Sequence, residues 1–286
     1  MKKFMKNAIL PGLLLCLSAA LVAQQPSGGT SKPVVQPAQP SGKHVPQAKT
    51  KPEFNDYNTA YAVAGGAASE KAADEFSAKY PDSELKPFLY SKAIHEYQTE
   101  NDKVKIEAMG EKVLQYDPDN PVALVLTATV MADTLSDSDL DREKKVATIK
   151  KNSDHALQTI NSDFAAGTNI SPEQLAAYKK TLQSMAHSAL GIAALKSGDD
   201  AGAEKELKTA ADVNSTQPDP YIWYHLALAQ DHQKKYPEAL VSVNQAVQYA
   251  GSDPDLAALA QGELARLRTL NQVGPEAAKP QQTPPK

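Results

Sequence analysis

Apolar residues between positions 56 and 270 recur at the three- and four-residue intervals of amphipathic helices, without the alternation that marks strands. At four places a capping residue stands directly before a proline: Asn120-Pro121, Ser171-Pro172, Asp219-Pro220 and Asp253-Pro254. The capping side chain accepts an otherwise unpaired backbone N–H, and proline at the first helical position gives up an N–H that has no helical partner. The pattern therefore predicts an all-α protein with helices beginning at these prolines.

The clearest unit lies in residues 220–253 and reads as two antiparallel helices joined by a short turn. Its expected core residues, from their spacing, are Trp223, Leu226, Ala227, Ala239, Val243 and Ala246. Small side chains at 227 and 239 allow the two helices to approach closely, and the larger ones fill the volume beside that contact. Such a unit cannot bury its apolar face alone, so neighbouring units are expected.

Similar patterns precede and follow this unit. Residues 184–217 form a second good copy, with core positions occupied by Leu190, Gly191, Ala203, Leu207 and Ala210, and with two extra residues in the following loop. Weaker copies are expected at 56–83, 86–120 and 121–163, the last with a long turn at 136–141, and residues 171–195 are expected to form one long helix. A final helix at 254–270 is expected to cap the stack with an apolar stripe of Leu256, Leu259, Leu264 and Leu267, while Arg266 and Arg268 face water.

The repeats resemble those of tetratricopeptide-repeat (TPR) proteins over most of residues 56–270, most strongly in 184–253. The phrase Phe76-x-x-x-Tyr80-Pro81-Asp82-Ser83, together with an export signal and a tether, is similar to exported bacterial members, including outer-membrane assembly factors of the BamD and YbgF type. The resemblance implies an α-solenoid of antiparallel helix pairs, wound as a right-handed superhelix. Its concave face, lined by the first helix of each pair, would bind a peptide or a partner protein.

On that template the candidate partner-binding residues are Tyr221, Tyr224, His225, Leu228, Asp231 and His232, with Phe88 and His95 in an earlier repeat. Tyrosine combines a large contact area with a polar tip, so an amphipathic patch is expected here, and partial burial against a neighbouring helix is the alternative. Chaperone-binding family members grip a terminal carboxylate with lysines, asparagines and an arginine. The matching positions here are Ser91, His95, Ser188, Ile192, Tyr224 and Leu228, so a C-terminal carboxylate is not the expected ligand.

The first 23 residues read as a secretory signal peptide. Lys2, Lys3 and Lys6 precede an apolar run from 8 to 23 that Pro11 interrupts, and cleavage is expected after Ala23. The run is shorter than the ~20 residues that a membrane-spanning helix needs, so the mature chain is expected to have no transmembrane segment. An uncleaved anchor is the alternative, and lipidation is not expected because Leu15 precedes Cys16 where a lipoprotein signal has a small residue.

Composition bounds the rest of the chain. Residues 24–52 are rich in proline, glutamine and lysine and lack aromatic residues, so they are expected to be a disordered linker before a folded region at 53–272, and 273–286 a disordered tail. The whole chain has a formal net charge of −4, and seven lysines without a single acidic residue precede Glu53, so the remainder carries −11. An acidic body excludes nucleic acid as the expected partner. Cys16 is the only cysteine, so the mature chain is expected to lack disulfides and cysteine chemistry.

No motif for catalysis, a cofactor or a metal emerges from the sequence. His95-Glu96 matches the start of a zinc-protease motif, but Thr99 stands where the second histidine belongs, and His225 and His232 lack a third ligand. The sequence therefore predicts a non-enzymatic interaction scaffold or adaptor of the bacterial cell envelope, periplasmic or secreted, that binds a protein or peptide and has no cofactor. The alternative is a glycan- or peptidoglycan-binding protein that uses exposed tyrosines.

Overall fold

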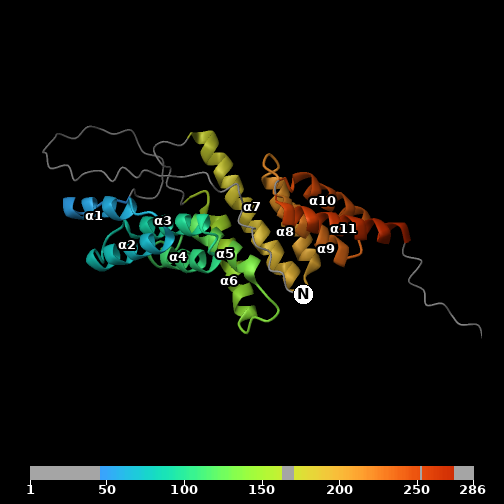
Figure 1. The fold of residues 1–286 in the computed structure, drawn as a ribbon, viewed down its shortest axis with the longest axis horizontal. Coiled ribbons are helices and arrows are strands. Elements are labelled where there is room, and N and C mark those ends of the chain that lie inside the picture. Colours follow the sequence, from blue (N-terminus) through green and yellow to red (C-terminus); the bar gives the residue numbers. More distant parts are fainter. Residues whose placement is uncertain (1–45, 163–170, 252, 274–286) are drawn as a thin grey trace, which may run out of the picture. The chain divides into compact units, whose positions relative to one another are not determined.

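The computed structural model describes residues 46–162, 171–251 and 253–273 (Figure 1). The described residues form helices joined by turns, with no strand among them. The expected signal peptide, most of the expected linker and the expected tail from 274 onward lie outside these residues. The helices are α1 (Lys51–Tyr61), α2 (Gly66–Lys79), α3 (Lys86–Thr99), α4 (Lys103–Tyr116), α5 (Pro121–Thr134), α6 (Arg142–Thr159), α7 (Pro172–Lys196), α8 (Asp200–Val213), α9 (Pro220–His232), α10 (Tyr236–Tyr249) and α11 (Pro254–Val273).

The chain divides into two compact units, residues 1–189 and 190–286, with the division inside α7. In the first unit each of α1 to α5 packs against the next helix along the chain, and in the second unit each of α8 to α10 does the same. Helices two apart also touch, since α1 contacts α3 and α9 contacts α11. This pairing of each helix with its sequence neighbours confirms the predicted all-α solenoid of helix pairs.

Every predicted proline-marked helix start is confirmed. Asn120 Oδ1 accepts the N–H of Ala123 at 3.0 Å, Asp219 Oδ1 that of Tyr221 at 2.8 Å, and Asp253 Oδ1 that of Leu256 at 3.0 Å. Ser171 and Gln174 form a reciprocal capping box, in which each side chain accepts the backbone N–H of the other residue. The caps fix where α5, α7, α9 and α11 begin.

Three of the turns within helix pairs share one geometry. Asn101, Gly198 and Lys234 adopt left-handed backbone conformations, with φ of 55°, 80° and 61°. In each turn the following residue donates its N–H to the carbonyl five residues earlier, at 3.0, 3.0 and 2.9 Å. This is the Schellman ending of a helix, which normally favours glycine at the left-handed position. The same turn geometry thus recurs between α3 and α4, α7 and α8, and α9 and α10.

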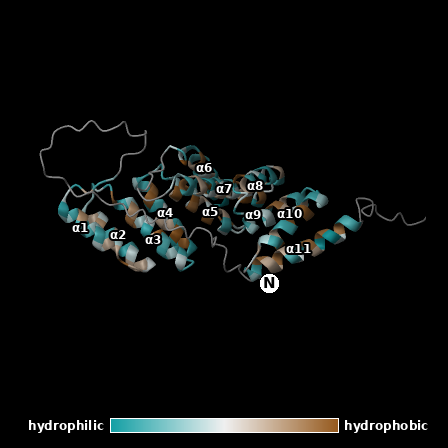
Figure 2. Cartoon of the chain, turned by 90° about the horizontal axis from the view of Figure 1, so that it is seen from above, coloured by the Kyte–Doolittle hydropathy of each residue, from teal (hydrophilic) through white to brown (hydrophobic). Residues whose placement is uncertain are grey.

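The helix α5 is among the most hydrophobic segments (Figure 2), and most of its residues are buried. Both units have buried cores, and the predicted positions Leu226, Ala227, Ala239, Val243 and Ala246 are among the buried residues, as are Gly191, Ala203, Leu207 and Ala210. Gly191 packs so tightly that an added Cβ would lie 2.5 Å from Leu207 Cγ.

Trp223 packs against the core of the second unit as expected, although Trp223 and Leu190 are only partly buried and the neighbouring Ile222 is buried more deeply. Two other expectations need correction. Leu259 is 36% exposed and Ala260 takes its expected place in the buried stripe of α11. The expected linker also ends too late, because Thr50 caps α1 at Lys51. Ala48 is already buried, so folded structure begins within residues 46–52.

Candidate functional site

Four of the six predicted binding residues of α9 lie on a stripe whose two ends contact residues at the start and in the later turns of α11. Tyr221, Tyr224, Leu228 and Asp231 follow one another at three- and four-residue intervals and therefore share one side of the helix. Tyr221 Oη donates to Asp253 Oδ2 at 2.5 Å at the start of α11, and Arg266 of α11 donates to Asp231. The expected patch thus makes contacts inside the protein at both of its ends.

Arg266 is exposed, as expected, and also makes contacts inside the protein. Its guanidinium donates to Glu263 on its own helix and to Asp231 on α9, whose carboxylate side chain is only 12% exposed. The hydrogen bond to Glu263 is the main cause that raises the pKa of Arg266 further, and Asp231 adds to it. Arg266 therefore ties the C-terminal half of α11 to the end of α9.

Tyr224 lies half-buried on α9, between the Tyr221–Asp253 contact and the Asp231–Arg266 contact. Its ring packs against the core of the second unit and meets the ring of His225 edge-on at a centroid distance of 5.7 Å. Burial raises the pKa of Tyr224, Glu263 adds to the increase, and Arg266 opposes it. Tyr224 therefore remains a neutral hydroxyl at neutral pH. Both outcomes that the sequence left open for it are present, namely partial burial and a partly exposed aromatic surface.

The two histidines of α9 are held by their Nδ1 atoms. His225 Nδ1 lies 2.8 Å from the carbonyl oxygen of Tyr221, and since a carbonyl only accepts, this nitrogen carries the proton. His232 Nδ1 lies 2.9 Å from Asp200 Oδ1 on α8. His225 is half-buried and His232 is exposed, so the ring orientations are set by the protein while both rings keep surface exposure.

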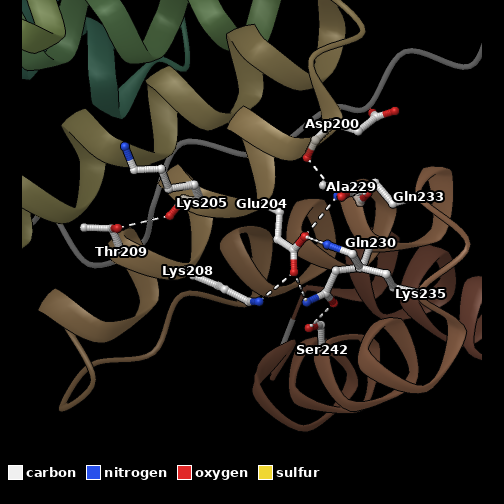
Figure 3. A network of polar contacts seen from close by, with 10 residues as sticks. All are labelled: Asp200, Glu204, Lys205, Lys208, Thr209, Ala229, Gln230, Gln233, Lys235 and Ser242. Atoms are coloured by element: carbon white, nitrogen blue, oxygen red, sulfur yellow. Dashed lines mark hydrogen bonds and ion pairs between the residues drawn. The ribbon is translucent and has the colours of Figure 1, made fainter.

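Beside His232, a carboxylate that sequence reasoning missed joins α8 to the turn between α9 and α10 (Figure 3). The Glu204 side chain is 8% exposed and receives hydrogen bonds from Lys208 at 2.6 Å and Lys235 at 2.6 Å. Gln233 donates to it at 3.0 Å and the buried Gln230 at 3.4 Å. A buried carboxylate costs solvation free energy unless it is paired and hydrogen-bonded. Here both lysines and both glutamines offset that cost.

The charge of Glu204 is stabilised in the folded protein. Burial acts to raise the pKa of Glu204, but the hydrogen bonds from Lys208, Lys235, Gln230 and Gln233 outweigh burial and lower the pKa to about 2. Gln230 in turn accepts a hydrogen bond from Ser242 of α10 at 2.7 Å. The Glu204 network therefore links α8, α9 and α10 and holds the end of α9 that carries His232. One sequence signal could have revealed part of it, since Glu204 and Lys208 are four residues apart on a helix.

Phe88 and His95 belong to α3 in the first unit. Phe88 is partly buried against the core, and His95 is partly buried next to Glu96. Glu96 Oε2 and the Oε1 atom of Glu100 each accept a backbone N–H at the start of α2, from Gly65 and Gly66, at 2.7 Å in both cases. The carboxylates near His95 therefore serve as helix caps, and the double glycine supplies the backbone amides that they cap.

A polar seam in the first unit was also missed. Glu70 on α2 accepts hydrogen bonds from Tyr97 of α3 and Lys105 of α4. One turn further along α2, Asp74 accepts from Tyr90 at 2.8 Å and Lys112 at 3.0 Å, again from α3 and α4. Each carboxylate thus joins three consecutive helices. These residues therefore stabilise the stack.

The tyrosines bear on the glycan-binding alternative. Of the eleven tyrosines, all of which the structure describes, only Tyr116 and Tyr249 are exposed. The ring of Tyr116 already stacks on Tyr90 at a centroid distance of 5.9 Å, and Lys86 Nζ lies 4.1 Å from its centroid. Tyr249 is on α10 in the other unit. Stacking platforms for sugar rings are therefore few in the part of the chain that the structure covers.

Two features are absent from the described residues. Within residues 46–162, 171–251 and 253–273, no three His, Cys, Asp or Glu side chains are grouped so that they could hold a metal ion. Among the same residues, no helix has the length and apolar character needed to cross a membrane.

The chain is similar to a solved TPR structure. No known protein family and no curated protein matches the sequence. The similarity is to the crystal structure of a thermophilic TPR protein of Thermus thermophilus, at 14% sequence identity and with a TM-score of 0.46. It covers 74% of this chain and 99% of that one.

Proposed function

We propose that this chain is a non-enzymatic scaffold that binds a partner protein in the bacterial cell envelope. The observation that carries the proposal is the packing of each helix pair on its sequence neighbours, with the first helices of successive pairs side by side, as α9 and α11 are. Stacked repeats of this kind present an extended surface of helices, and such surfaces bind other chains. The exported character of the chain rests on the sequence of its first 23 residues alone.

The surface we assign to the partner lies on α9 and α11. Tyr221, Tyr224 and Asp231 are partly engaged by α11, so a partner meets the rim that these residues form with α11 rather than a free row of α9 side chains. His225, Leu228 and His232 keep partial or full exposure on α9. Phe88 and His95 form a separate candidate surface on the first unit.

Crosslinking in cells that express the tagged full chain tests this function. We expect the chain to be recovered crosslinked to one or a few envelope proteins, with signal-peptide cleavage after Ala23 visible in its mass. The double variant Leu228→Ser with His232→Ala should reduce the recovery of those proteins, and Val241→Ser on α10 should not. Recovery of glycan fragments without protein would instead support the glycan-binding alternative.

A further inference from the structure

The helices α9 and α11 lie side by side and run in the same direction. The contact of Tyr221 with Asp253 fixes their beginnings, and the contact of Asp231 with Arg266 fixes their later turns. On α11, Asp255, Leu259, Gly262 and Arg266 share one stripe, because they too are three or four residues apart. Since Arg266 reaches α9, this stripe borders the α9 stripe. We call the two stripes together the α9–α11 face.

The α9–α11 face has an exposed apolar part. Leu259 is 36% exposed and Leu228 is half-buried. Between Leu259 and Arg266 stands Gly262, around which no atom lies within 4 Å of the position that a Cβ would take. The surface at Gly262 is therefore level with the helix backbone, which leaves room for another chain to approach closely.

Gly262 differs from every other glycine that the structure describes. Gly65, Gly198 and Gly251 have positive φ, and an added Cβ at Gly66, Gly110, Gly191 or Gly202 would collide with a neighbour. Gly262 has neither a positive φ nor a neighbour that would collide with a Cβ, although glycine inside a helix lowers stability by about 0.5–1 kcal/mol relative to alanine. Contacts within the described part of the chain do not account for this residue.

The α9–α11 face is strongly acidic. Asp219, Asp231, Asp253, Asp255 and Glu263 lie on or beside it, whereas α9 and the first three turns of α11 contain no lysine or arginine. Among the described residues of this face, Arg266 is the one arginine or lysine, and it is shared by two carboxylates. The nearby Lys208 and Lys235 both form ion pairs with Glu204. The other lysine near this face is Lys234, in the turn beyond α9.

We propose that the α9–α11 face binds a cationic segment of a partner protein that carries an apolar side chain next to its lysine or arginine residues. The apolar side chain contacts Leu228, Leu259 and the level surface at Gly262, and the cations pair with Asp255 and the acidic rim. This inference rests on the proposed function and names the chemistry of the partner. A polyanion or an acidic peptide does not fit, because it would bring like charges together.

The test uses the full chain and isothermal titration calorimetry. Trp223 lies on α9 but packs against the core of the second unit and outside the stripe that forms this face, so its fluorescence serves to monitor the fold. The probe is a short peptide of lysine, leucine and glycine, compared with one in which glutamate replaces lysine and one in which glycine replaces leucine. We expect saturable binding of the first peptide only, with an affinity that falls as the salt concentration rises.

Matched variants locate the binding. Asp255→Lys and Leu259→Ser on α11 should each weaken the lysine–leucine peptide about tenfold or more, because each removes one of the two kinds of contact. Glu238→Lys and Val241→Ser make the same changes at exposed positions of α10 and should leave the affinity unchanged. All four positions are on the surface, so circular dichroism should show wild-type helix content in each variant.

Two results would overturn the inference: equal binding of the glutamate peptide, or equal weakening by the α10 variants. Failure of the proposed function looks different, because then crosslinking in cells would yield no protein partner at all. Recovery of a protein partner together with no peptide binding would remove only the cationic segment proposed here.

Discussion

The glycines show at the scale of single residues how the fold constrains the sequence. In Gly191→Ala the added Cβ would lie 2.5 Å from Leu207 Cγ and 3.2 Å from the backbone N of Leu207, which belongs to a rigid helix. We expect this variant to lose about 1–3 kcal/mol of stability, the usual cost of overpacking. Gly262→Ala meets no atom and should gain about 0.5–1 kcal/mol. Urea unfolding followed by Trp223 fluorescence measures both, and equal effects would refute this account of Gly262.

The left-handed residue before α10 gives a second prediction. Lys234 has φ of 61°, where glycine is favoured because it has no Cβ. Lys234→Gly should therefore stabilise the second unit by about 0.5–1 kcal/mol. Gly198→Ala, at the equivalent turn with φ of 80°, should destabilise it by about 1 kcal/mol. Thermal unfolding of the two variants checks the signs, and two changes of the same sign would contradict the shared turn geometry.

Side-chain positions were predicted less well than helix boundaries. The spacing placed Trp223 in the core, and the side chain does pack against the core, although it is only partly buried and Ile222 is buried more deeply. On α11 the error is one residue, from Leu259 to Ala260. Neighbouring residues on a helix differ by about 100° in direction, so a wide apolar stripe leaves its centre undetermined within one residue.

Among the elements, the junction between α8 and the α9–α10 turn depends most on one group. Glu204→Gln removes the negative charge that pairs with Lys208 and Lys235 and replaces one of the two acceptor oxygens by an NH2 donor. We expect a loss on the order of 2–3 kcal/mol at neutral pH. Glu238→Gln on α10 is the matched control, because this exposed side chain should contribute almost nothing. Chemical unfolding with the Trp223 signal measures the difference.

The same variant should change how stability depends on pH. The pKa of Glu204 is about 2 in the folded protein and lies near the ordinary glutamate value when unfolded, so the unfolded state takes up a proton first as the pH falls. The stabilisation by the Glu204 carboxylate is therefore complete above the unfolded pKa and disappears as the pH falls through about 2. Glu204→Gln should lose less stability than wild type between pH 5 and about 2. Parallel curves would show that other carboxylates cause the acid sensitivity.

The terminal helix α11 is part of the core of the second unit. Leu267 is fully buried, while Leu259 is 36% exposed on the same helix. Leu267→Ala should cost about 2–5 kcal/mol, because it leaves a cavity. Leu259→Ala should cost under about 1 kcal/mol, since little area returns to water. If thermal unfolding gave similar losses for both, α11 would not pack as described.

Helix order and pairing were predictable for a physical reason. The caps Asn120, Ser171, Asp219 and Asp253 act within a few residues of the chain, so the sequence alone reveals them. The partners of the candidate site are different, because Asp231 meets Arg266 at a separation of 35 residues. Such a pairing depends on how two helices pack, which no local pattern encodes. Partial burial of the candidate residues against a neighbouring helix was the alternative that the sequence offered, but the sequence did not identify α11 as that helix.

At the scale of the whole molecule, the division into two compact units predicts separable unfolding. Leu89 is buried in the first unit, and Leu89→Ala should destabilise that unit by about 2–5 kcal/mol. Repeat proteins transmit such losses mainly to adjacent repeats. The circular dichroism midpoint should therefore fall by more than the midpoint of Trp223 fluorescence, which reports the second unit. Equal shifts by both probes would mean that the chain unfolds as one unit.

The polar contacts between helices also affect the order in which the chain folds during its synthesis. The contact of Gly65 cannot form until Glu96, 31 residues later, has been synthesised, and that of Asp231 requires Arg266, 35 residues later. Glu70 likewise receives Lys105 from a later helix. A ribosome delivers the chain from its N-terminus, so each finished helix pair still lacks partners that have not been synthesised. Stable structure in the nascent chain should consequently trail synthesis by about one repeat, which keeps the most recent segment extended and accessible.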